Sequence, residues 1–107
     1  MKSLLSAWCL LFLIFAPLLN LGFVMSHEAA HDQINIYHGC LDSRITYFNL
    51  AGPQTTCYSW GVGSDRESAF AWHSLNEIVG YNVIWLVNTL LFAVFLFGSL
   101  YSVRGER

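Results

Sequence analysis

The chain has 107 residues, of which 55% are hydrophobic, 16% are aromatic and only 11% are charged. Soluble domains carry about 25% charged residues, so this composition disfavours a soluble domain and indicates a membrane protein. Five Lys and Arg against seven Asp and Glu give a formal net charge of −2. That balance excludes the basic surface typical of nucleic-acid binding. The length allows one domain, residues 1–107.

Two apolar runs without a charged residue occupy residues 4–25 and 78–103. About 20 apolar residues span the hydrocarbon core of a bilayer as a helix, so both runs are expected to be transmembrane helices. A signal peptide is the alternative for the first run, since Lys2 precedes it. Its 22 apolar residues exceed the usual apolar region of such a peptide, which favours a retained helix.

The connecting segment, residues 26–77, holds two arginines and six acidic residues, whereas Lys2, Arg104 and Arg107 flank the two apolar runs. By the positive-inside rule, both termini are expected in the cytoplasm and the connecting segment outside. The sequence therefore predicts a two-pass integral membrane protein whose first partner is the lipid bilayer.

Helical signals extend both runs into the connecting segment. The first helix is expected to continue to about Tyr37, with Gly39 as its stop. A second helix is expected to begin near Arg66, with Ser64 or Asp65 as its cap.

A short β-hairpin is expected between these helices. Residues 45–48 and 56–60 are rich in β-branched and aromatic side chains, and residues 49–54 have the composition of a turn. Cys40 and Cys57 flank the first strand; they can form a disulfide if the segment is outside the cytoplasm and remain free if it is inside. The predicted fold class is a mainly α membrane protein, with two transmembrane helices joined by a segment containing a hairpin.

One motif carries chemistry, because His27-Glu28-Ala29-Ala30-His31 matches H-E-x-x-H. Residues four apart share a face of a helix, so the imidazoles of His27 and His31 can bind one metal ion. Glu28 can hold a water beside that ion and take its proton. Zinc lowers the pKa of such a water and polarises a carbonyl, so the motif predicts Zn²⁺ and hydrolysis.

A site of this kind needs a third protein ligand, and Glu77 is the candidate. A two-helix hairpin brings the end of the first helix beside the start of the second, and a carboxylate at a membrane boundary is costly unless paired or metal-bound. His73 and Tyr81 lie four residues before and after Glu77 and share its face. His73 is expected to be an alternative ligand or a transition-state donor, and Tyr81 a hydrogen-bond donor to the oxyanion.

The motif is followed by Gly39, a hydrophobic strand at residues 45–48 and a Gly-containing turn at residues 50–52. This pattern, covering about a third of the chain, resembles the site-2-protease-type membrane metallopeptidases. The resemblance implies zinc, the two motif histidines as ligands and the glutamate between them as base. That family takes its third ligand from an Asp in an N-P-x-D-G-type motif, which this sequence lacks. Glu77 instead resembles the glutamate ligand of gluzincin-type metallopeptidases, which lies on a later helix.

Each of these residues also has a plainer interpretation. The two motif histidines can be polar residues that end a transmembrane helix, with Glu28 a solvated carboxylate. The dipole of the second helix can stabilise Glu77 in its first turns. His73 and Tyr81 can be packing or interface residues.

Two functional hypotheses follow. The first is a small membrane zinc metallopeptidase that hydrolyses peptide bonds of a peptide or membrane protein near the membrane surface. The second is a non-catalytic membrane subunit or adaptor, whose helices pack against partner helices or a second copy, with small residues such as Gly80 at the contact. Convergence of His27, His31 and Glu77 favours the first hypothesis, and a Glu77 that faces away favours the second.

Overall fold

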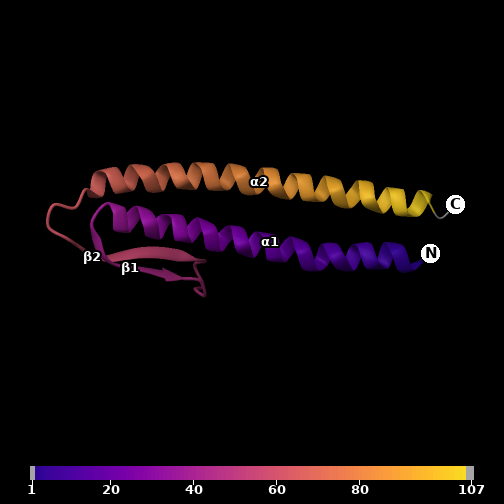
Figure 1. Ribbon diagram of the computed structural model, residues 1–107, viewed down its shortest axis with the longest axis horizontal. Coiled ribbons are helices and arrows are strands. Elements are labelled where there is room, and N and C mark those ends of the chain that lie inside the picture. The colour runs from indigo at the N-terminus through magenta and orange to yellow at the C-terminus, as the bar shows by residue number, and fades with distance from the viewer. Residues whose placement is uncertain (1, 106–107) are drawn as a thin grey trace. The chain divides into compact units, whose positions relative to one another are not determined.

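The computed structural model describes residues 2–105, which form two long helices joined by a hairpin (Figure 1). The elements are α1 (Lys2–Tyr37), β1 (Cys40–Thr46), β2 (Gln54–Trp60) and α2 (Arg66–Arg104). The expected fold class is confirmed, because both helices are apolar and long enough to cross a membrane and the strands pair antiparallel. Arg107, used in the topology prediction, lies outside the described residues.

Both helices are longer than a bilayer requires. At 1.5 Å per residue, the 36 residues of α1 and the 39 residues of α2 extend about 54 and about 58 Å. The hydrocarbon core measures only about 30 Å. Each helix is therefore longer than its apolar run, and residues 66–77 are the more polar stretch that precedes this run in α2.

The chain divides into two compact units. One unit, here the helical unit, comprises the described residues of Met1–Leu21 and Val83–Arg107. Inside it, the side-chain amides of Asn20 and Asn88 donate to each other's carbonyl oxygens at 2.9 and 3.0 Å. Because the surrounding side chains of both helices are mostly apolar, this reciprocal pair fixes the register of the two helices in this unit.

The other unit, Gly22–Asn82, contains the hairpin and the H-E-x-x-H motif and is called the site unit below. The helix boundaries in it follow the sequence prediction. Gly39 stops α1 with a φ of +93°, a value that glycine adopts without a Cβ clash. Asp65 caps α2, since its Oδ1 accepts a hydrogen bond from the Ser68 backbone amide at 3.0 Å.

The hairpin differs from its prediction in both strands, and β2 begins at Gln54, a residue expected in the turn. β1 begins at Cys40, five residues earlier than expected, and ends at Thr46, so Phe48 lies in the turn. Residues 40–44 carry few β-branched side chains, but backbone pairing from Cys40–Trp60 to Thr46–Gln54 makes them a strand. A disulfide between Cys40 and Cys57 joins the two strands. The sequence had left the pairing of these cysteines open.

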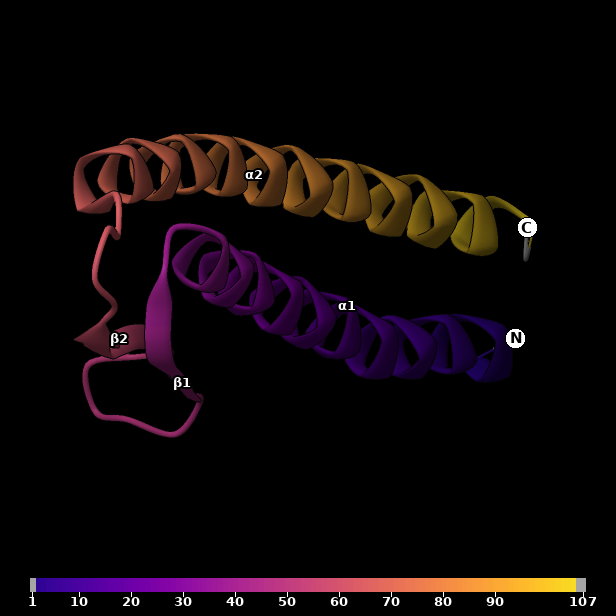
Figure 2. The same ribbon diagram turned by 60° about the vertical axis from the view of Figure 1, so that its left-hand side comes forward.

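The hairpin doubles back along the last turns of α1 (Figures 1 and 2). Asn35 Nδ2 donates to Ser43 Oγ at 3.1 Å, which ties β1 to the helix. Thr55 Oγ1 donates to the backbone oxygen of Glu28 at 3.1 Å, which ties β2 to it. Half of the buried residues of this unit are polar: Glu28, His31 and Asn35 are buried together with Cys40, Ala69 and Gly80. Because burying polar groups is costly, this arrangement needs a reason.

Candidate metal centre

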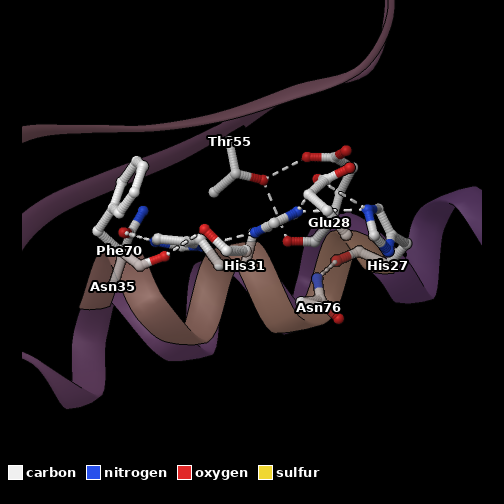
Figure 3. A network of polar contacts seen from close by, with 10 residues as sticks. His27, Glu28, His31, Asn35, Thr55, Phe70 and Asn76 are labelled. Atoms are coloured by element: carbon white, nitrogen blue, oxygen red, sulfur yellow. Dashed lines mark hydrogen bonds and ion pairs between the residues drawn. The ribbon is translucent and has the colours of Figure 1, made fainter. Parts of the chain in front are cut away.

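The two motif histidines, which Figure 3 labels, converge with Glu77 in the site unit. His27 and His31 lie one turn apart on α1, and Glu77 reaches them from α2. His27 Nε2 and His31 Nε2 are 3.3 Å apart, and Glu77 Oε1 lies 3.2 Å from the first and 2.6 Å from the second. Among the described residues, these three form a group that could hold a metal ion.

These distances fit a small tetrahedral ion. Ligands about 2.0–2.1 Å from zinc lie about 3.3–3.4 Å from one another in a tetrahedron. Two of the three separations match that edge at 3.3 and 3.2 Å. The third, 2.6 Å, is a charge-assisted hydrogen-bond length. Three ligands would leave one tetrahedral position open, which is the mark of a catalytic rather than a structural site.

The path of α2 past His27 depends on a glycine. A Cβ on Gly80 would lie 2.6 Å from Cε1 and Nδ1 of the His27 ring, closer than packed atoms come. The sequence suggested Gly80 as a contact for partner helices. In the structure its missing side chain instead makes room for a candidate ligand of the same chain.

Glu28 is held beside the three ligands but is not one of them. Its residue is only 7% exposed. Thr55 Oγ1 lies 2.6 Å from Glu28 Oε2 and donates to this carboxylate from the hairpin (Figure 3). This hydrogen bond restricts the Glu28 side chain to one orientation.

A chain of hydrogen bonds leads from His31 away from Glu77. His31 Nδ1 lies 2.6 Å from His73 Nδ1, and His73 Nε2 lies 2.8 Å from Asn35 Oδ1. Asn35, which is 3% exposed, continues to Ser43 of the hairpin. His31 is thus held at both ring nitrogens, as metal-binding histidines usually are.

The pKa values of two side chains of α2, His73 and Glu77, are lowered in this environment. Burial lowers the pKa of the His73 imidazole, and the neighbouring His31 and His38 lower it further. Burial alone would raise the pKa of the Glu77 carboxyl, but hydrogen bonds from His31 and His27 hold that pKa below its usual value. Glu77 therefore carries the negative charge that a cation would need.

An open cavity of about 540 Å³ adjoins the candidate ligands. Both helices and the hairpin contribute to its lining, the hairpin through the end of its turn and the start of β2: Glu28, His31, Pro53, Gln54, Thr55, Thr56, Phe70, His73, Ser74 and Glu77. Glu28, His31, His73 and Glu77 were expected at the site from the sequence. The cavity is open, so these four side chains line a space that can be reached from outside the protein.

One expected residue stands apart from the others. Tyr81 is 64% exposed and is not among the residues that line the cavity. Conversely, three polar residues with contacts to the site were missed: Thr55, Asn35 and Ser43. Asn35 lies four residues after His31, so helical spacing was a usable signal. No signal marked the two hairpin residues, because their contacts depend on how the hairpin folds back.

No family model, curated protein or solved structure matches this chain at a significant level. The comparisons therefore give no support to the resemblance to membrane metallopeptidases. What the structure does provide is a group, His27, His31 and Glu77, that could hold a metal ion.

Proposed function

We propose that this chain is a membrane-anchored, zinc-dependent hydrolase of peptide bonds. One observation carries the proposal: two imidazole nitrogens and a carboxylate oxygen lie within 3.3 Å of one another. The buried carboxylate of Glu28 and an open cavity lie beside them. A polar cluster with a purely structural role would need neither the cavity nor a second carboxylate.

The donor set favours zinc over other ions. Two imidazoles and one carboxylate, with a fourth position open, are the ligands of catalytic zinc sites. Calcium and magnesium prefer oxygen ligands in larger number, and the three ligands here include only one oxygen donor. His27, His31 and Glu77 are therefore the proposed zinc ligands.

Glu28 is the proposed general base. When bound, zinc supplies Lewis-acid polarisation of the scissile carbonyl and makes water easier to deprotonate. Glu28 accepts a proton from the attacking water while the oxygen of that water bonds to the carbonyl carbon. The C–N bond then breaks, and Glu28 returns the proton to the leaving amine. The hydroxyl of Thr55 keeps the carboxylate in place during both transfers.

His73 is proposed to orient a ligand and Tyr81 to stabilise charge. With Nε2 of His31 used as a ligand, the proton of that ring must be on Nδ1, which donates to His73 Nδ1. His73 then carries its own proton on Nε2 and donates to Asn35 Oδ1. Tyr81 would donate to the oxyanion after its exposed side chain turns toward the cavity, so Tyr81→Phe should lower the hydrolysis rate and keep zinc.

The disulfide supports a location for the site. Disulfides persist in oxidising compartments, so the Cys40–Cys57 bond favours a connecting segment outside the cytoplasm. We therefore propose a two-pass topology with cytoplasmic termini and with the metal centre on the outer side of the membrane. A peptide or the outer part of a membrane protein is the proposed substrate.

The metal content of the purified protein tests the proposal. We expect about one zinc ion per chain in the wild type and a loss of that zinc in His31→Ala. His38→Ala is the matched control, because His38 bonds to Ile34 O and Ser68 outside the candidate centre. Equal zinc in the wild type and His31→Ala would refute the metal centre and favour a non-catalytic membrane subunit.

A further inference from the structure

The turn of the hairpin is apolar, uncharged and uncovered. The turn, residues 47–53, contains no charged residue, and none occurs anywhere from residue 45 to residue 64. Phe48 and Leu50 are 100% and 109% exposed. Large apolar side chains at a loop tip are unfavourable in water, so an apolar partner is expected to cover them.

Two contacts fix the direction in which this turn points. Near the end of α1, Asn35 bonds to Ser43 of β1. Further back on the helix, Glu28 bonds to Thr55, which pairs with Ile45. Moving along β1 toward the turn therefore means moving toward lower-numbered residues of α1, that is, toward its apolar run (Figure 1).

The turn reaches the level at which the apolar run ends. β1 ends at Thr46 and Phe48 lies in the bend after it, so the chain from Ile45 to Phe48 covers at most about 10 Å. That length equals about six or seven residues of helix, which from Glu28 leads to about residues 21–22 of α1. The apolar run of α1 ends at Met25, so the turn lies beside its last residues.

We propose that the hairpin turn seats Phe48 and Leu50 in the lipid bilayer, at the boundary between headgroups and acyl chains. We expect lipid, rather than another protein, to cover these two side chains, because the turn continues the apolar surface of α1 at the membrane boundary. The inference does not depend on zinc and goes beyond the proposed hydrolase function. One consequence is that the cavity, lined by Pro53 and Gln54, opens next to the membrane surface.

Nitroxide depth measurements in phosphatidylcholine vesicles test this proposal. In a Cys9→Ser background, Phe48→Cys provides a single labelling site, because the other two cysteines form the disulfide. Oxygen and chromium oxalate then report the depth of the label. Val62→Cys is the matched control. It is 110% exposed, and its neighbour Gly61 donates to Gly39 O at 2.9 Å, just past the end of α1 at Tyr37. Tyr37 lies about 18 Å along the helix axis from Met25.

The label at position 48 is expected about 5–10 Å below the lipid phosphates, and the label at position 62 is expected in water. Leu50→Cys should repeat the result of Phe48→Cys and covers the case in which one labelled variant fails to fold. Equal chromium oxalate accessibility at positions 48 and 62 would overturn the proposal. Dipolar broadening between labels at position 48 would show that two turns lie close together. If that broadening disappears on dilution with lipid and the label is then in water, the turn contacts a second copy of the chain and the proposal is overturned.

Discussion

His31 Nδ1 and His73 Nδ1 lie 2.6 Å apart, on the side of the His31 ring that faces away from Glu77. This contact extends the candidate centre into a chain of hydrogen bonds that ends on the hairpin. A metal-binding imidazole needs a fixed tautomer, and an acceptor at its second nitrogen provides it. The buried polar residues of the site unit thus have a physical reason to be there.

Replacing His73 should weaken zinc binding without removing it. His73→Ala deletes the acceptor for His31 Nδ1, and loss of such a partner typically costs about 10–100-fold in metal affinity. Asn35→Ala should cost less, because it acts one bond further away. Competition with a chromophoric chelator measures the affinity. His38→Ala serves as control, and an unchanged affinity in His73→Ala would rule out this orienting role.

A second prediction concerns the glycine that faces His27. In Gly80→Ala the new Cβ would lie 2.6 Å from the His27 ring, so the ring or α2 must move. Because His27 is a proposed ligand, we expect zinc affinity to fall and the site unit to unfold at lower temperature. Gly22→Ala is the matched control. Nothing lies within 4 Å of that position, and alanine favours a helix over glycine by about 0.8–1 kcal/mol.

Chelator competition and thermal unfolding in detergent would report both effects. Two results would count against the contact: a zinc affinity in Gly80→Ala equal to that of the wild type, or a loss of the same size in Gly22→Ala. The first would mean that α2 passes His27 at a greater distance than the structure shows. The second would mean that any alanine in the helices of this unit disturbs the centre.

Replacing Glu28 should greatly slow hydrolysis without affecting metal binding. Glu28→Gln keeps a side chain of the same shape beside Thr55 but cannot accept a proton, so zinc content should stay unchanged. Hydrolysis of a fluorescence-quenched peptide library should fall about 10²–10⁴-fold, the usual contribution of general acid–base catalysis. Activity equal to that of the wild type would remove Glu28 as the base, while zinc binding would remain a separate result.

Much of this architecture is readable from the sequence because it depends on local signals. The helix stop at Gly39 and the cap at Asp65 follow from backbone conformation and side-chain chemistry within a few residues. Helical spacing put His27 and His31 on one face, and the hairpin topology of the helices brought Glu77 to them. Each of these inferences needed only the period of a helix and the order of the elements.

The remaining features depend on contacts between elements that are distant in the chain. Thr55 forms a hydrogen bond with Glu28, 27 residues away in the sequence, and the composition of a strand does not predict such a contact. Strand β1 begins at Cys40 because β2 pairs with it, although its own residues have weak strand propensity. The contact of Gly80 with His27 could not be predicted for the same reason, since a glycine does not indicate which ring will approach it.

The disulfide should contribute to the stability of the site unit. Cys40 and Cys57 are 17 residues apart, and closing a loop of this size stabilises a fold by about 3 kcal/mol in the chain-entropy model. Denatured, unreduced protein made in an oxidising compartment should show one free thiol, that of Cys9, and three after reduction. Reduction, or Cys57→Ser, should lower the unfolding temperature, whereas Cys9→Ser should leave both the temperature and its response to reductant unchanged. Three free thiols before reduction would contradict the bond, and with it the argument that the metal centre lies outside the cytoplasm.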